Sequence, residues 1–167
     1  MPPTDDELLR QARRIGAACR ARGVTLATAE SCTGGLVAHL ITEVPGSSGY
    51  FLGGAVTYSN DLKTALVDVP APMLATYGAV SAQVAVAMAE GVRRRLGVDL
   101  GVAVTGVAGP DGGTDEKPVG LTYIAVADAA GHEVRRFHWD ADRPGNKRES
   151  AAAALALAAE RLEATTS

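Results

Sequence analysis

Residues 24–35 read Val-Thr-Leu-Ala-Thr-Ala-Glu-Ser-Cys-Thr-Gly-Gly, and this stretch decides the fold class. Its first six residues alternate as a β-strand does, polar residues then gather, and two glycines precede a helical pattern that begins at Leu36. A strand that turns directly into a helix is typical of layered α/β proteins. We therefore expect an α/β fold with Ser31 at the carboxyl end of a strand.

Helical and strand patterns alternate along the rest of the chain. Thr4 and Glu7 form a capping box at the start of a helix. Pro70 and Pro72 are expected to end a short helix that begins near Asn60. The other predicted elements are a helix from Leu36, a helix capped by Ser81, strands at 51–58, 100–105, 119–127 and 133–139, and a helix over about 146–162. This order predicts a three-layer α/β/α sandwich with a mixed sheet.

Composition narrows the class of protein. The 167 residues carry a net charge of −3, and they are 47% apolar, 21% charged and 4% aromatic. A chain of this length is expected to form a single domain, 1–167, and its apolar fraction excludes intrinsic disorder. The acidic balance argues against nucleic acid as a partner, and no apolar run is long enough to cross a membrane. Two cysteines and the absence of a secretory signal pattern indicate a cytoplasmic protein.

The stretch around Ser31 is the first candidate site. A hydroxyl between a strand end and a helix N-terminus lies beside backbone N–H groups that can hold an anion or oxyanion. Ser31 and Thr33 are equally good N-caps for the following helix, and both interpretations stand at this point. Cys32 is a rival nucleophile, although a small buried hydrophobic residue is the favoured interpretation.

A serine nucleophile needs a base, and residues 57–63 (Thr-Tyr-Ser-Asn-Asp-Leu-Lys) form a second strand end that turns into a helix. Neither Ser-x-x-Lys nor Gly-x-Ser-x-Gly occurs around Ser31, and the three histidines are poorly placed to reach it. Lys63 can serve if burial or a neighbouring cation lowers its pKa, with Tyr58 as a proton relay. No spacing typical of a metal site occurs, so we expect no metal.

Residues 105–113 (Thr-Gly-Val-Ala-Gly-Pro-Asp-Gly-Gly) and 117–120 (Lys-Pro-Val-Gly) form the third candidate stretch. So many glycines after a strand indicate a loop whose backbone approaches a ligand closely, and the alternative is a flexible surface turn. The run is not a Walker A motif, because no Lys-Ser/Thr pair follows it. It is not a dinucleotide-binding fingerprint either, because a strand comes next.

Together with Gly78-Ala-Val-Ser81, these three stretches closely resemble the CinA C-terminal domain family, whose enzymatic members are nicotinamide-nucleotide amidases. The resemblance runs from about Leu8 to the last helix and suggests the stand-alone form of the family. It implies hydrolysis of the carboxamide of nicotinamide mononucleotide to nicotinate mononucleotide and ammonia. It also implies a homodimer and a site without metal or other cofactor.

Site roles follow from the resemblance position by position. Ser31 would be the nucleophile, Lys63 its general base and Tyr58 an assisting hydroxyl. The expected substrate-binding residues are Glu30, Thr33, Gly34, Gly35, Asn60, Thr105, Gly106, Gly109, Gly112, Gly113, Arg143 and Arg148.

The substrate's phosphate also needs cationic partners, and the start of the last helix offers Arg143, Lys147 and Arg148. The family usually has an arginine four residues after the first one, where this chain has Lys147. Lysine and arginine are not interchangeable at bidentate phosphate sites, so this departure bears on substrate affinity.

A non-catalytic nucleotide-binding or partner module, linked to competence or DNA damage, is the alternative to an amidase. The run Arg93-Arg94-Arg95 is better explained as cations at a helix C-terminus than as a nucleic-acid site. The alanine-rich face of the last helix, 151–162, can pack either on a second copy or on its own sheet.

Overall fold

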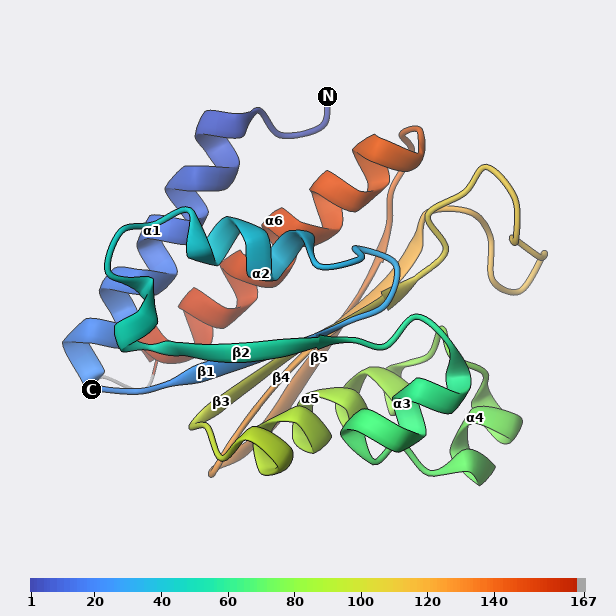
Figure 1. Ribbon diagram of the computed structural model, residues 1–167. Coiled ribbons are helices and arrows are strands. Elements are labelled where there is room, and N and C mark those ends of the chain that lie inside the picture. Colours follow the sequence, from blue (N-terminus) through green and yellow to red (C-terminus); the bar gives the residue numbers. More distant parts are fainter. Residues whose placement is uncertain (165–167) are drawn as a thin grey trace.

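The computed structural model describes residues 1–164, and it shows a five-stranded mixed sheet between two layers of helices (Figure 1). The strand order is β2-β1-β3-β4-β5. β1 (Leu26–Glu30) pairs in parallel with β2 (Phe51–Val56) on one side and with β3 (Leu100–Gly106) on the other. β4 (Leu121–Asp128) and β5 (Gly131–His138) extend the sheet by antiparallel pairing. The predicted α/β class with a mixed sheet is confirmed.

Helices cover both faces of the sheet, as Figure 1 shows. One layer contains α1 (Asp5–Arg22), α2 (Leu36–Thr42) and α6 (Arg143–Ala164). The other contains α3 (Asn60–Val67), α4 (Ala71–Tyr77) and α5 (Ala82–Leu96). A 3₁₀ turn at Ser47–Gly49 leads into β2. None of the helices within residues 1–164 is long and apolar enough to cross a bilayer.

Helix α4 was not predicted, and the sequence pattern explains the error. Asp68 ends α3 in a left-handed conformation (φ 59°), so Pro70 and Pro72 do not end that helix. They lie instead at the start of α4, with Pro70 at the N-cap position and Pro72 in the first turn. Proline is tolerated there because the first N–H groups of a helix have no partner within it.

The alanine-rich face of α6 packs inside this molecule. Ala151, Ala154 and Ala158 are fully buried and belong to the core shared with α1, α2 and the sheet. Small side chains let α6 lie close to the strands beneath it, which suits a core with few aromatic residues. The face is therefore used by its own fold and not left open for a second copy.

The layer beneath β1 depends on a close backbone contact between α5 and α3. A Cβ atom at Gly91 of α5 would overlap the carbonyl oxygen of Val67, the last residue of α3. Gly91 is itself buried, so an added methyl group could not be accommodated by turning toward solvent. This contact sets the position of α3 against the sheet.

We expect Gly91→Ala to lower the free energy of unfolding by about 1–3 kcal/mol, because the cost of overpacking exceeds the gain of roughly 1 kcal/mol in helix propensity. Urea unfolding of the purified protein measures this. Gly49→Ala is the control, because a Cβ at Gly49 meets no atom within 4 Å. Equal stabilities of the two variants would contradict the proposed close contact.

Candidate active site

Ser31 lies where β1 ends, held from both sides by the backbone. Its N–H donates to the carbonyl of Val104 in β3 (2.9 Å), and its carbonyl accepts from the N–H of Gly34 (3.1 Å). Gly35, with φ of 103°, then turns the chain into α2 in a conformation that a side chain would disfavour. The hydroxyl of Ser31 is thereby fixed at the carboxyl edge of the sheet.

The cap of α2 is supplied by Glu30. The buried carboxylate of Glu30 accepts from the N–H groups of Val37 (2.8 Å) and Ala38 (3.0 Å) and from the hydroxyl of Thr33 (2.7 Å). A carboxylate at this position also complements the positive end of the helix. The interpretation of Ser31 as an N-cap is therefore wrong, and its hydroxyl accepts no hydrogen bond from the first N–H groups of α2.

Lys63 meets Ser31 from the opposite layer of helices. Ser59 caps α3 by accepting from the N–H of Leu62 (3.1 Å), and one helical turn later Lys63 points inward with only 1% of its surface exposed. Its Nζ lies 3.0 Å from Ser31 Oγ, 2.8 Å from the carbonyl oxygen of Thr57 and 3.2 Å from that of Tyr58. The predicted nucleophile and base are in contact.

The surroundings of Lys63 shift its acid–base equilibrium toward the neutral amine. Burial lowers the pKa of its amine below the ordinary value of 10.5, since charge is costly away from water. A neutral amine has two N–H donors and one lone pair. In the structure Nζ donates to the hydroxyl of Ser31 as well as to the carbonyls of Thr57 and Tyr58, so loss of one proton from the amine gives a lone pair within reach of Ser31 Oγ. This is the arrangement of a general base.

Cys32 is unsuited to act as a nucleophile. Its side chain is 7% exposed, and burial raises the pKa of its thiol to about 12. The thiolate, which is the reactive form, is therefore scarce at neutral pH. The interpretation of Cys32 as a small buried hydrophobic residue is the one that its environment supports.

Ser31 and Lys63 open into a cavity of about 290 Å³. Six of the predicted substrate-binding residues line it: Asn60, Thr105, Gly106, Gly109, Gly112 and Arg143. The other six do not, namely Glu30, Thr33, Gly34, Gly35, Gly113 and Arg148. The lining also includes Tyr58, Ala79, Val80 and Asp111, of which only Tyr58 was expected at the site.

Tyr58 joins the dyad through its backbone. Its carbonyl accepts from Lys63, whereas its hydroxyl accepts from Arg143 Nη2 at 3.0 Å. The residue is 60% exposed, so the ring lies at the mouth of the cavity. A role for the hydroxyl in proton transfer stays a prediction.

The glycine-rich loop after β3 is anchored along its length. Asn146 Nδ2 donates to the carbonyl of Ala108 (2.9 Å), and Arg143 Nη1 donates to that of Gly109 (2.7 Å). Further along, Lys117 Nζ donates to the carbonyl of Tyr77. These contacts favour the ligand-loop interpretation over a flexible turn. Asn146 was missed by the sequence analysis, and its only signal there is a polar residue at the start of a helix.

A second hollow of about 370 Å³ adjoins the cavity and shares Arg143 with it. Its walls are Leu36, Arg143, Pro144, Lys147 and Arg148, and we call it the cationic groove. The guanidinium of Arg148 is committed to the N-terminal segment, where it donates to the carbonyl of Pro3 (2.9 Å) and to Asp5 (2.6 Å). Of the three cations of this groove, only Arg143 also lines the cavity that contains Ser31 and Lys63.

Comparison with known proteins identifies the family. The sequence profile of the CinA C-terminal domain matches residues 9–162. The chain belongs to the CinA C-terminal domain family. A CinA-like protein from Citrifermentans bemidjiense is 57% identical over 78% of this chain and 31% of its own length, so the chain spans about a third of that relative.

Solved structures of the CinA family share the whole fold. The competence/damage inducible protein CihA from Agrobacterium tumefaciens superposes with a TM-score of 0.90 at 39% identity and covers 98% of both chains. The competence damage-inducible protein A from Klebsiella pneumoniae superposes with a TM-score of 0.91 at 31% identity over 95% of this chain and 99% of its own.

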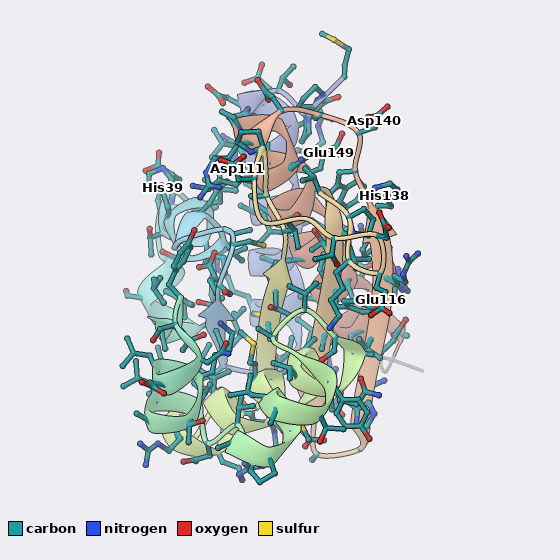
Figure 2. All side chains as sticks on the ribbon, turned by 90° about the vertical axis from the view of Figure 1, so that its right-hand side faces the viewer. His39, Asp111, Glu116, His138, Asp140 and Glu149 are labelled. Carbon is teal, nitrogen blue, oxygen red and sulfur yellow. The ribbon has the colours of Figure 1, made fainter. Side chains whose placement is uncertain are left out.

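The histidines of this CinA-family chain lie away from the dyad. His39 is beside Glu43 on α2, His132 contacts Glu90, and His138 contacts the carbonyl of Val119 (3.0 Å). Figure 2 shows His39 and His138 on opposite sides of the molecule. Within residues 1–164, no group of three or more His, Cys, Asp or Glu side chains is placed to hold a metal ion.

The lowered pKa of Lys63 predicts a pH-dependent stability. Between that pKa and the ordinary value of 10.5, the unfolded chain binds a proton that the folded chain does not, so the free energy of unfolding rises with pH. We expect Lys63→Met to remove this rise. Urea unfolding at a series of alkaline pH values measures it, with Lys147→Met as a control that keeps the slope of the parent. An unchanged slope in Lys63→Met would refute burial as the cause.

Proposed function

We propose that this CinA-family chain hydrolyses the carboxamide of nicotinamide mononucleotide to nicotinate mononucleotide and ammonia. The observation that carries the proposal is the 3.0 Å contact between Ser31 Oγ and a buried lysine amine whose other two contacts are carbonyl oxygens. The substrate follows from the motifs around Ser31, Lys63 and the glycine-rich loop, which resemble those of nicotinamide-nucleotide amidases.

The first step forms an ester on the serine. Lys63 Nζ takes the proton of the Ser31 hydroxyl as Oγ bonds to the carboxamide carbon, and the carbonyl oxygen becomes an oxyanion. The protonated lysine then gives its proton to the nitrogen of the tetrahedral intermediate, which leaves as ammonia. A water molecule, deprotonated by Lys63, adds to the ester carbon. The bond to Ser31 Oγ then breaks as Lys63 returns the proton to Oγ, which releases the carboxylate product and restores both residues.

The oxyanion requires N–H donors near Ser31 Oγ. The N–H of Ser31 itself is used by the carbonyl of Val104. The next two backbone N–H groups, of Cys32 and Thr33, donate to no other residue among residues 1–164. They follow Ser31 directly in the turn, and we assign the oxyanion to them.

Size and charge divide the substrate between the two hollows. The cavity of about 290 Å³ takes the nicotinamide ring against Ser31. The phosphate, which carries close to two negative charges at neutral pH, extends past Arg143 toward Lys147 in the cationic groove. Lys147 contributes a point charge where the family usually has a guanidinium, so this contact lacks bidentate geometry.

The alternative function, a binding module without catalysis, uses the same cavity. It is suggested by the names of related proteins, such as competence/damage inducible protein. The cations that suggested nucleic acid are largely engaged, since Arg93 donates to the carbonyl of Asp99 and Arg95 to that of Ala65. The dyad favours the amidase, because a binding module gains nothing from a buried lysine.

We expect the parent to release ammonia from nicotinamide mononucleotide with chelator present, and Ser31→Ala and Lys63→Ala each to lower kcat/KM by about 10³-fold or more. A coupled ammonia assay measures this, with circular dichroism to verify folding. Cys32→Ala is the control and should retain activity. Substrate binding without turnover by the parent would favour the binding module, and an active Ser31→Ala would refute the mechanism.

We expect Lys147→Ala to raise KM about threefold to tenfold with little change in kcat, because its charge meets the phosphate and not the reacting carbon. Steady-state kinetics on nicotinamide mononucleotide and on its riboside, which lacks the phosphate, measure this. The riboside should not distinguish the variant from the parent. Arg148→Ala provides the contrast, with a smaller effect, because its guanidinium is committed to Asp5. A larger effect of Arg148→Ala would reverse the assignment of the phosphate.

A further inference from the structure

Asp111 is a charged group of the cavity that the mechanism does not use. Among residues 1–164 it is the only acidic residue that lines the cavity, and its carboxylate has no hydrogen bond or ion pair with any described residue. Figure 2 shows Asp111 on the side of the glycine-rich loop toward His39, whereas Glu116 of the same loop lies toward His138. Asp111 and Glu116 thus have different surroundings although they belong to one loop.

The backbone of the loop holds Asp111 at this position. Arg143 fixes Gly109 two residues before it, and Gly112 immediately after it has a φ of 88°, which a side chain would disfavour. The N–H of Thr114 donates to the carbonyl of Lys117 (2.8 Å), which closes the far side of the loop. An unpaired carboxylate is therefore presented to the cavity by an anchored segment.

The other charged residues of the cavity indicate which kind of ligand this carboxylate can recognise. Arg143 is the exposed cation at the mouth, and Lys63 is the buried base. A substrate with an anionic phosphate and a cationic ring matches a site with one cation and one anion. The ring nitrogen of nicotinamide mononucleotide is quaternary and positively charged, so it has no N–H to donate. It is recognised by a negative charge or by the face of an aromatic ring.

The cavity offers few aromatic side chains that could bind a cationic ring. Tyr58 is the only aromatic residue among the described lining residues, and its hydroxyl is already tied to the cation Arg143. A guanidinium at the edge of the ring makes Tyr58 a poor partner for a second cation. The carboxylate of Asp111 is the group left to meet the positive ring.

We propose that Asp111 is a specificity-determining residue that selects the positively charged pyridinium form of the substrate over forms with a neutral ring. The inference rests on the proposed amidase function, and it adds the part of the substrate that this chain's anionic group recognises. Because the carboxylate is exposed at the cavity mouth, the effect is modest and weakens with salt.

Binding to Ser31→Ala, which holds the substrate without turnover, tests the proposal. Titration calorimetry compares nicotinamide mononucleotide with its dihydro form, which has the same carboxamide, ribose and phosphate but a neutral ring. We expect the added change Asp111→Asn to weaken binding of the pyridinium form about threefold to tenfold and binding of the dihydro form less than twofold. The matched control Glu116→Gln should change neither, and the loss should shrink at high ionic strength.

Three outcomes overturn the proposal, and they are distinguishable from failure of the proposed function. Equal weakening of both ligands by Asp111→Asn would make the residue structural. If Asp111→Asn weakens the binding of neither ligand, Asp111 does not contact the substrate. If Glu116→Gln has an equal effect, the selectivity comes from the net charge of the loop and not from Asp111. If the parent neither binds nor hydrolyses nicotinamide mononucleotide, the proposed amidase function is wrong as well. If the parent hydrolyses it and Asp111→Asn has no effect on binding, only the role of Asp111 is wrong.

Discussion

The buried amine of Lys63 is the constraint on which the rest of the site depends. An amine with 1% exposure can be accommodated only if its N–H groups have acceptors, and the carbonyls of Thr57 and Tyr58 supply them at the end of β2. The third contact of Nζ is the hydroxyl of Ser31, and no carboxylate among residues 1–164 forms an ion pair with the amine. A carboxylate there would pair with the ammonium and raise the pKa of the amine, whereas burial beside neutral carbonyls lowers it.

The sheet order explains how two helical layers can meet at one dyad. Because β2, β1 and β3 are parallel, their carboxyl ends bring Thr57, Ser31 and Thr105 to the same edge. The helix after β1 lies on one face and the helix after β2 on the other, so Ser31 and Lys63 approach from opposite sides. Figure 1 shows α6 beginning at this same edge, where its first turn reaches over to the glycine-rich loop. The close contact of Gly91 with Val67 then sets how far α3 stands from the sheet, and with it the reach of Lys63.

The sequence predicted the fold class and the dyad because both have local signals. Strand ends rich in polar residues are visible at Ser31 and again before Lys63, and parallel strands bring such ends together. Contacts between distant segments had no such signal. Glu30 was expected to bind substrate, yet it caps the helix that begins six residues later, a role that Ser31 and Thr33 fit equally well from sequence alone. Arg148 was expected at the phosphate, and only the packing of the N-terminal segment shows that its guanidinium is engaged by Asp5. Asn146 was missed for the same reason, since its partner Ala108 lies 38 residues away.

The charges of the site fall into two groups with different physics. Lys63 is only 1% exposed where it lines the cavity, and burial lowers the pKa of its amine, an effect that salt screens less than it screens interactions between exposed charges. Arg143, Lys147 and Asp111 lie at the openings of the two hollows, where water and salt weaken their fields. In the proposed function, catalysis depends on the buried group and ligand selection depends on the exposed ones. The two are separate in space, and the 3.0 Å contact between Ser31 and Lys63 is formed in a chain that has a lysine at position 147.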